Sequence, residues 1–356
     1  MATILDVTDL TLQNDEALSI SEAVFELVYN SKVLNTIHTV MSGIERDKNI
    51  PIFGNMPVLG KCLTGCGTTA TGKKIPTSQK VWTPKLIGDK LEHCDADLDP
   101  LFKVFKRSKK ANELNDITGS ETASFILASA EQALLEMLWR YIDFGDTEIA
   151  LTTDSGTLKD SEYFGVENFN CIDGKWKQLF AIATADSTKK VAISKNAEAT
   201  YAAQLALGAS DALDTMRSMY ENADSRMFGQ QGLHFELTRS LYNNWIAFRE
   251  DKGFLHTLNA DEAARSGQDN YRGIPIIVRD DWDRSIRQFF DNGTKYNLPH
   301  RAVLIANGNQ PVGTLDEGSL TEVKSWYNMD DELWKLKFAS KIDVKILEDK
   351  MVMVAY

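Results

Sequence analysis

The fold is decided by the stretch Trp334-Lys-Leu-Lys-Phe-Ala-Ser-Lys-Ile-Asp-Val-Lys-Ile346 near the end of the chain. Apolar residues occupy its even positions, and only Ser340 interrupts them. Because successive side chains of a strand point to opposite faces, this alternation predicts one long strand with a buried face. Glu348-Asp-Lys350 should form a turn, after which Met351-Val-Met-Val-Ala-Tyr356 returns as the partner strand.

The residues before this stretch predict a protein of mixed helix and strand. The longest expected helix, 120–144, follows the cap Ser120 and has apolar residues at helical spacing. At about 1.5 Å per residue it would form a rod of roughly 36 Å. Between 150 and 335 the patterns predict three shorter helices and two buried strands. The helices are expected near Ala209–Glu221, at 238–253 and after Asp281, and the strands at 273–279 and 300–306.

The segment 49–100 differs from the rest of the chain. It holds five of the eight prolines, several glycines and only short apolar pieces such as Lys80-Val-Trp-Thr83. This composition predicts strands in a long extended loop rather than part of a compact core. A loop of this length is usually functional or disordered.

Charge is distributed unevenly along the 356 residues. The chain carries 39 basic and 51 acidic residues, a formal net charge of −12. Residues 1–50 have a net charge of −5, whereas 51–110 hold five acidic and eleven basic residues, a net of +6. The acidic total excludes a protein that grips nucleic acid through its surface as a whole. The basic segment could bind an acidic neighbouring surface instead.

The sequence also bounds the size of the core and the compartment. A single core rarely exceeds about 250–300 residues, so two lobes or a core with long excursions are expected. No run of about 18 apolar residues occurs, and Met1–Leu10 lacks the pattern of a signal peptide. The four cysteines, Cys62, Cys66, Cys94 and Cys171, should then be reduced thiols inside a cell.

Three motifs suggest an enzyme or a calcium site, and each fails at a specific position. Gly67-Thr-Thr-Ala-Thr-Gly-Lys-Lys74 has the spacing of a phosphate loop, but Lys74 replaces the hydroxyl residue that holds magnesium. Asp154-Ser-Gly156 matches an aspartic protease loop, yet no second copy exists, so a turn is expected. Asp95-x-Asp97-x-Asp99 begins like a calcium loop, but Pro100 and Lys106 occupy positions that need Gly and Glu.

Two further groups of residues favour simple structural roles. Cys62, Cys66, His93 and Cys94 could bind zinc, but their spacing is imperfect and buried cysteines are common. His38, His234, His256 and His300 have no evident partners, and the basic stretch 103–110 is best explained as a solvated face. We therefore nominate no catalytic residue, no cofactor and no metal ligand, and we expect no enzymatic activity.

The order of these parts resembles the major capsid proteins of tailed bacteriophages, which share the α+β Johnson fold of the Hong Kong phage type. The most specific local match is Tyr271-Arg-Gly-Ile-Pro-Ile-Ile-Val278, which looks like a strand of that family's axial domain. His300-Arg-Ala-Val-Leu-Ile-Ala306, the loop 308–313 and the terminal 344–356 follow in the family's order. The resemblance covers most of the chain, although its motifs are short.

The resemblance implies a division into parts. Residues 1–48 would be an N-terminal arm with a first helix, and 49–100 an extended β-hairpin loop that reaches over a neighbouring subunit. Residues 101–149 and 336–356 would form the peripheral domain with its spine helix and closing strands, and 150–335 the axial domain. The extended loop would contact the neighbour through Lys73, Lys74, Lys80, Trp82 and Lys85.

The function that the resemblance implies is structural. The chain would self-assemble into hexamers and pentamers of an icosahedral virion shell that encloses double-stranded DNA, assembled in the host cytoplasm. Its other partners would be a portal, possible scaffold or decoration proteins, and packaged DNA by non-specific proximity, without a membrane. Two alternatives stay open: an encapsulin-like nanocompartment shell and, with far less support, a nucleotide-binding enzyme of the phosphate-loop type.

Overall fold

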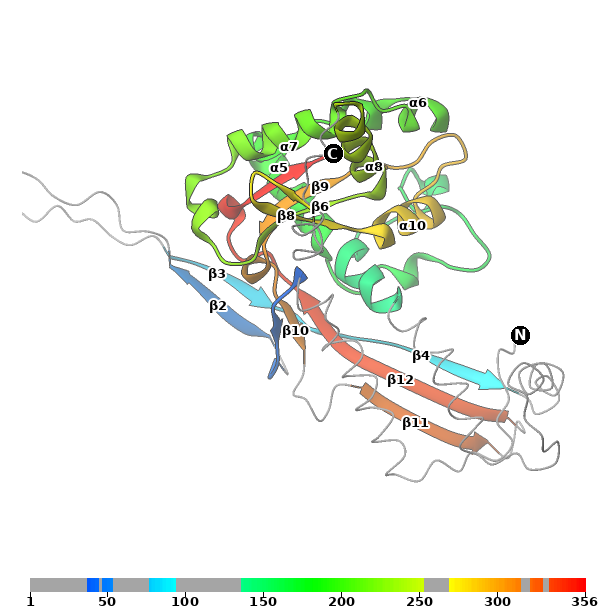
Figure 1. The fold of residues 1–356 in the computed structure, drawn as a ribbon. Helices are drawn as coiled ribbons and strands as arrows, with labels where there is room; N and C mark the ends of the chain where they lie inside the picture. Colours follow the sequence, from blue (N-terminus) through cyan, green and yellow to red (C-terminus); the bar gives the residue numbers. More distant parts are fainter. Residues whose placement is uncertain are drawn as a thin grey trace, which may run out of the picture.

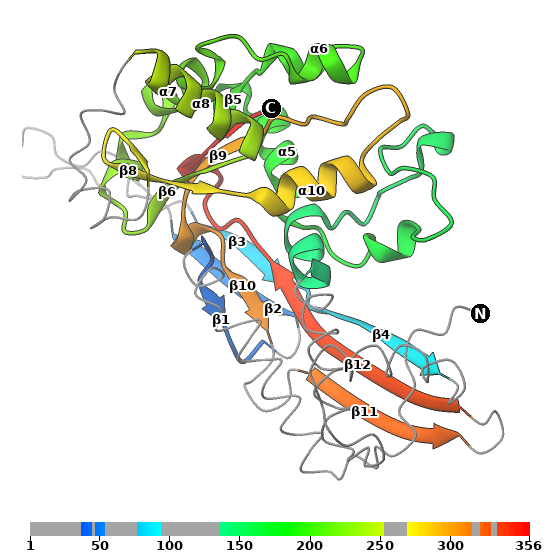
Figure 2. The same cartoon turned by 45° about the vertical axis from the view of Figure 1, so that its right-hand side comes forward.

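The computed structural model describes residues 37–44, 47–53, 77–93, 136–252, 269–314, 321–328 and 333–356. Strands in this part of the chain form three sheets. A rounded body contains a six-stranded sheet, and an elongated five-stranded sheet projects away from it (Figure 1, Figure 2). The third sheet is a two-stranded ribbon.

The six-stranded sheet has the order β5-β13-β9-β6-β8-β7. Strand β6 pairs parallel with β8 and antiparallel with β9, so the sheet is mixed. Two of its strands, β8 and β9, confirm the strands predicted from the sequence at 273–279 and 300–306. The bounds are β5 (Lys190–Val191), β6 (Leu233–Leu237), β7 (Asn270–Tyr271), β8 (Ile274–Val278), β9 (Ala302–Ala306) and β13 (Val352–Ala355).

Helices lie on both faces of this sheet. Three of them, α7, α8 and α10, confirm the helices expected from the apolar spacing. Of the long helix expected at 120–144, residues 136–144 are helical, and 120–135 lie outside the described residues. The bounds are α5 (Lys175–Ala185), α6 (Tyr201–Leu205), α7 (Asp211–Asn222), α8 (Arg239–Asp251) and α10 (Asp280–Phe289).

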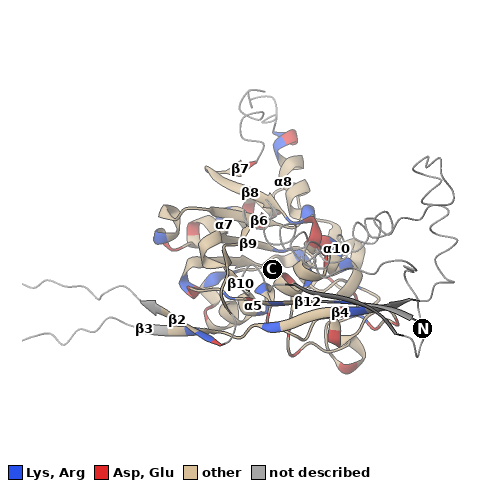
Figure 3. Ribbon diagram, turned by 90° about the horizontal axis from the view of Figure 1, so that it is seen from below, with Lys and Arg blue, Asp and Glu red and all other residues tan. Residues whose placement is uncertain are grey.

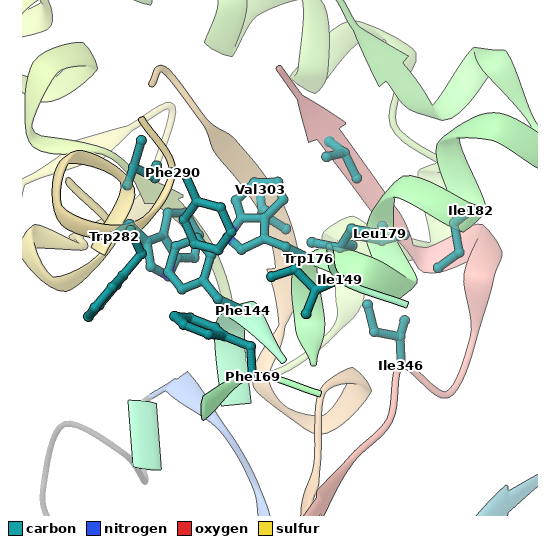
Figure 4. Close-up of a cluster of buried hydrophobic side chains, with 14 of the residues drawn as sticks. Phe144, Ile149, Phe169, Trp176, Leu179, Ile182, Trp282, Phe290, Val303 and Ile346 are labelled. Carbon is teal, nitrogen blue, oxygen red and sulfur yellow. The ribbon is translucent and has the colours of Figure 1, made fainter. Parts of the chain in front are cut away.

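Alternation along the central strands divides the core into two clusters. On one face, Val303 and Val354 pack with aromatic side chains of α5 and α10, among them Trp176 and Trp282 (Figure 4). On the other face, Leu304 and its neighbours in β6 and β13 pack against α7 and α8. Neither face of the sheet is left to solvent, which explains why β9 is buried at all five positions.

The five-stranded sheet is built around one long central strand. Strand β12 (Leu333–Val344) pairs with β4 (Lys85–His93) on one side. Its other side pairs first with β11 (Thr321–Asn328) and, towards its end, with β10 (Val312–Thr314). Strand β10 in turn pairs with β1 (Val40–Met41). At about 3.3 Å per residue, β12 is roughly 40 Å long.

The long strand predicted from the even-numbered apolar residues is thus confirmed. Where side chains are described, the even positions are buried, with Ile342 at 1% exposure and Val344 and Ile346 at 0%. The odd positions Ala339 and Asp343 are buried as well. Lys337 and Lys341, the other odd positions of β12 whose side chains are described, are half-buried.

The predicted closing hairpin is wrong. Met351 to Tyr356 do not return along β12, because β13 pairs with β9 and β5 in the six-stranded sheet. Residues 345–351 instead carry the chain from one sheet to the other. The apolar run 351–356 predicts a strand correctly but contains no information about its partner.

Residues of the predicted extended loop form a ribbon. Strand β2 (Lys48–Phe53) pairs antiparallel with β3 (Thr77–Trp82) over six positions. Residues 54–76, which join them in sequence, lie outside the described part. The chain then turns at 83–84 into β4 and thereby leaves the ribbon for the five-stranded sheet.

Replacement of Leu304 by Ala should destabilise the fold strongly, because Leu304 is fully buried in β9. A cavity at such a site costs about 2–5 kcal/mol of unfolding free energy, measurable by urea denaturation. The matched control is Leu205→Ala, at a leucine that is 44% exposed. A loss at Leu304 no larger than at Leu205 would contradict the described core.

Candidate assembly surface and buried charge network

The residues predicted to contact a neighbouring subunit fall into two groups, one described by the structure and one outside the described residues. Lys73 and Lys74 lie outside the described residues. Lys80 and Trp82 lie on β3, and Lys85 begins β4. Lys80, Trp82 and Lys85 are close in sequence, but each has a different environment in the structure.

Lys80 joins the ribbon to the segment that crosses between the sheets. Its Nζ donates to the carbonyl oxygen of Ile346 and to Oδ1 of Asp349, each at 2.5 Å. The lysine side chain is 28% exposed and that of Asp349 54%. An ion pair this exposed contributes only about 0–1 kcal/mol to stability. Together with the bond to Ile346 it attaches the ribbon to residues 346–349 of the same chain.

Trp82 lies inside the chain. It is 2% exposed and covers Gly313 of β10, where an added Cβ would meet the indole ring at 2.7 Å. Glycine is therefore required at 313 by this close approach. A contact between Trp82 and a neighbouring subunit remains a prediction, and the single chain leaves this side chain almost no surface for it.

Lys85 is exposed and lies next to an exposed apolar residue. Leu86 is 59% exposed, the second highest value among the large hydrophobic side chains exposed in the described part. Met41 on β1 and Val81 on β3 are each 37% exposed. Half of the six large exposed hydrophobic residues thus lie on strands outside the rounded body, where a partner could cover them.

A charge network is buried at the junction between the rounded body and the N-terminal segment. At its centre is Glu236 of β6, which is 0% exposed. Its Oε1 accepts from the Nζ of Lys175, and its Oε2 accepts from Nη1 of Arg279 at 2.6 Å. Gln310 donates to the same Oε1 at 2.9 Å. Buried charges of this kind persist only when they are paired and hydrogen-bonded.

Arg279 extends the network to two further acidic residues. Its Nη2 donates to Asp143, in the helical residues 136–144, and to Asp281 at 2.6 Å. The guanidinium carbon lies 4.6 Å from the ring centre of Trp139 and 4.7 Å from that of Trp282. The edge of the planar guanidinium is thus hydrogen-bonded to carboxylates, and its faces lie against the two indole rings. A lysine ammonium has no such planar faces.

The network also holds the N-terminal segment. The Nδ1 of His38 donates to the carbonyl oxygen of Gln310 at 2.7 Å. In return, the Gln310 side chain donates to the carbonyl oxygen of Ile37 at 2.7 Å. His38 is 1% exposed, and its Nε2 has no hydrogen-bond partner among the described residues. The arm is therefore anchored where it enters the described structure.

Burial and charge shift the pKa values of this network in different directions. Burial lowers the pKa of His38 to about 3, and the charge of Lys175 acts in the same direction. Burial raises the pKa of Asp143 to about 7, although Arg279 opposes the shift. Burial also tends to raise the pKa of Glu236, but Lys175, His234 and Arg279 outweigh it and hold that pKa well below its ordinary value.

Two amide side chains fix the segment that crosses between the sheets. Gln178 of α5 donates to the carbonyl oxygen of Val344 at 2.8 Å and accepts from the amide of Ile346 at 2.9 Å. Asn309 accepts from the amide of Glu348 at 2.7 Å and donates to its carbonyl oxygen at 3.0 Å. These bonds satisfy backbone groups at the end of β12 and in the segment that follows it.

The expectation that the histidines lack partners is wrong for His38, His234 and His300. The Nε2 of His234 lies 3.3 Å from Oε1 of Glu236, and Nδ1 of His300 lies 2.7 Å from Oγ of Ser240. His256 lies outside the described residues. The members of the network were missed because they come from distant parts of the sequence. One signal was present: Glu236 is a single acid in the apolar strand Leu233-His-Phe-Glu-Leu237.

The described part of the chain offers no arrangement suited to nucleophilic catalysis. Ser240 and His300 form a hydrogen bond, but the amides at the start of α8 are directed at a carboxylate. The Arg239 amide donates to Asp283 at 2.6 Å, so a developing oxyanion would meet a negative charge there. Asp154 lies in a short turn that ends at Ser155, as expected for this motif.

The described residues contain neither a candidate metal site nor a membrane-spanning helix. No group of three or more His, Cys, Asp or Glu residues is placed there to hold a metal ion. Cys62, Cys66 and Cys94, which were weighed as zinc ligands and not adopted, lie outside these residues, as do the motif 67–74 and the acidic stretch 95–99. None of the described helices is both long and apolar enough to span a bilayer.

Comparison with known proteins identifies the fold. No protein-family model matches the chain, and no curated protein sequence is significantly similar to it. Among solved structures, a chain of the satellite phage P4 procapsid, which includes the size determination (Sid) protein, matches with a TM-score of 0.53 at 10% identity. The match covers 94% of this chain and 96% of that one.

A second solved structure agrees. A chain from Gordonia phage Cozz matches with a TM-score of 0.50 at 11% identity, over 91% of this chain and 85% of that one. At such identities the likeness concerns the fold alone. The α+β Johnson fold that the sequence resemblance implies is thereby confirmed.

Replacement of Glu236 by Ala should destabilise the protein by about 3–5 kcal/mol, because Lys175 and Arg279 would lose their shared buried acceptor. Urea denaturation measures this loss. Glu250→Ala, at the exposed end of α8, serves as the control and should cost less than about 0.5 kcal/mol. Equal losses in the two variants would argue against the network.

The pH dependence of stability should change in opposite directions in two variants. Between the folded pKa of His38, about 3, and its ordinary value of 6.5, only the unfolded state binds the proton, so His38 makes stability fall as the pH falls. Between 3.8 and about 7, only the folded state keeps the proton of Asp143, so Asp143 makes stability fall as the pH rises.

His38→Gln should therefore make the slope of unfolding free energy against pH more negative between pH 5 and 6.5, and Asp143→Asn should make it more positive. Each change is at most about 1.4 kcal/mol per pH unit. Denaturation at several pH values measures the slopes independently of each variant's overall stability. Slopes that stay unchanged would show that these groups titrate normally.

Proposed function

We propose that this chain is the major capsid protein of a tailed bacteriophage. It would self-assemble into hexamers and pentamers of an icosahedral shell that encloses a double-stranded DNA genome. The observation that carries the proposal is the fold match with a chain of a phage procapsid, which extends over nearly the whole of both chains.

The shape of the described part supports a role in assembly. A ribbon and an elongated sheet extend outside the rounded body, which has a complete core of its own (Figure 1). These strands carry exposed apolar residues, and β12 connects them directly to the core. In a shell, such elements would reach neighbouring subunits while the rounded body keeps its fold. We propose no enzymatic role.

In the proposed capsid protein, each part of the chain would have its own role. Residues 1–48 would serve as the arm and 49–100 as the extended loop over a neighbour. Residues 101–149 and 336–356 would form the peripheral domain, and 150–335 the axial domain around which subunits gather. The described β13 lies beside strands of the axial part, so the last residues would tie the two domains together.

The remaining partners follow from a shell function. A portal would replace subunits at one vertex, scaffold or decoration proteins could assist assembly, and packaged DNA would lie close to the inner wall. Subunits would assemble in the host cytoplasm and end in the virion. Electron microscopy of the purified recombinant protein should show capsomers, tubes or shells, and a stable monomer at high concentration would overturn the proposal.

The basic loop should contribute to assembly through charge complementarity. Lys73→Glu, Lys74→Glu and Lys85→Glu together should reduce the assembled fraction severalfold at low salt, because the loop would lose its attraction to acidic neighbours. Sedimentation velocity at several salt concentrations measures the assembled fraction. Lys80 is left unchanged, since its contacts with Ile346 and Asp349 lie within the chain.

The matched control reverses three lysines of the rounded body, Lys159, Lys195 and Lys252. It alters the net charge equally but should leave assembly unchanged. If both triple variants lose assembly to the same extent, net charge rather than the loop is responsible, and the assignment of the loop is wrong.

A further inference from the structure

Two residues, Thr83 and Pro84, join the ribbon to the five-stranded sheet. The preceding residue, Trp82, ends β3 of the ribbon, and the following residue, Lys85, begins β4 of the sheet. Figure 3 shows the ribbon and β4 on opposite sides of this connection. The direction of the ribbon relative to the sheet therefore depends on the backbone at these two residues.

The sequence of the connection makes it stiff. The ring of Pro84 fixes its own φ at about −65° and biases the preceding Thr83 towards an extended backbone. Pro84 is buried, and so is Trp82, whose indole ring covers Gly313 of β10. Of the two connecting residues only Thr83 is exposed, so its torsion angles are the main freedom that the connection retains.

The carboxylate of Asp343 in β12 holds Thr83 in place. Its Oδ2 accepts from the amide of Thr83 at 2.7 Å and lies 3.5 Å from the Thr83 hydroxyl. Its Oδ1 accepts from the amide of Val344 at 2.8 Å. The Nζ of Lys345 lies 3.1 Å from Oδ2 and balances the negative charge. Both carboxylate oxygens thus have donors, and the donor at the shortest distance belongs to the connection.

Asp343 occupies a position where an acidic residue is unfavourable by itself. It is 1% exposed and lies between Ile342 and Val344, which are 1% and 0% exposed. A carboxylate buried to this extent destabilises a fold unless donors satisfy it. A residue that only continued the strand would be apolar or β-branched, as both neighbours are. The bonds to Thr83 and Lys345 therefore account for an acid at this position.

Lys80 supports the ribbon at a second point, through Ile346 and Asp349. That contact lies within β3 and not at the connection. The side chain of Asp349 is 54% exposed, so its ion pair contributes only about 0–1 kcal/mol. The buried carboxylate at the connection is the stronger of the two constraints.

We propose that Asp343 is a positioning residue for the extended loop. By holding the Thr83 amide, its carboxylate fixes the direction of the ribbon relative to β12 within a single chain. The inference rests on the proposed shell function and adds to it the residue that orients the loop before a neighbour binds. A ribbon with one preset direction loses less conformational freedom on assembly than a ribbon that swings about its base. Because Asp343 is buried, it would act without touching the neighbour.

The test compares Asp343→Ala with Asp173→Ala in the purified full chain. Asp173 is a matched control in the rounded body, because its Oδ1 accepts from the amide of Thr147 at 3.0 Å and from the hydroxyl at 2.7 Å. Hydrogen–deuterium exchange of dilute, unassembled subunits reports on the amides of 48–53 and 77–82 in the ribbon and on those of β9 in the core. Sedimentation velocity measures the protein concentration needed for assembly.

Asp343→Ala should make the ribbon amides exchange at least about tenfold faster and should raise the concentration needed for assembly severalfold. The β9 amides should be unaffected. Thr83→Val keeps the amide and removes only the hydroxyl at 3.5 Å, so it should behave like the original protein. Asp173→Ala should change neither ribbon exchange nor assembly. If Asp343→Ala also exposes the β9 amides, Asp343→Asn, which preserves the size of the side chain, decides with the same expected direction.

Ribbon amides that exchange at the original rate without the Asp343 carboxylate would overturn the inference. Faster ribbon exchange with unaltered assembly would overturn it too, because Asp343 would then stabilise the connection without positioning the loop, and the shell function would stand. If the original protein itself never assembles, the shell function fails, and the positioning role that rests on it fails as well, even where the exchange data show that Asp343 holds the ribbon.

Discussion

The arrangement of the rounded body depends on the buried ion pairs of Glu236. This carboxylate connects β6 to Lys175 of α5 and to Arg279 at the start of α10, and Gln310 connects it to the N-terminal segment. Four elements that are distant in sequence thus meet at one charge. Hydrophobic packing would tolerate small shifts between them, whereas a buried carboxylate with fixed donors does not. The network therefore defines how the elements around the sheet are oriented.

The second constraint is the continuous passage of the chain from β12 to β13. One segment supplies the central strand of the elongated sheet and, a few residues later, an inner strand of the six-stranded sheet. Gln178, Asn309 and Lys80 hold the connection in between. The segment between the two sheets is thus held by side chains from three other parts of the chain. Such a connection would suit the shell subunit that we propose.

Charge matters in two separate places in this protein. Buried ion pairs orient the body, and in the proposed shell a basic loop between acidic parts would align neighbouring subunits. The net charge of −12 describes neither of these roles, because each depends on where a few side chains lie. Lys80 illustrates the difference: it belongs to the basic loop, yet its described contacts with Ile346 and Asp349 lie within its own chain.

The sequence by itself determined the local elements. Apolar spacing identified α7, α8, α10, β8, β9 and β12, because the apolar residues of a helix or strand recur with the period of that element. Only the tertiary structure decided their partners. The pattern of 351–356 is the same whether the strand pairs with β12 or with β9, and nothing near His38 in the sequence indicates Gln310 or Glu236. Pairing and buried charge are properties of residues far apart in the chain, and local periodicity carries no record of them.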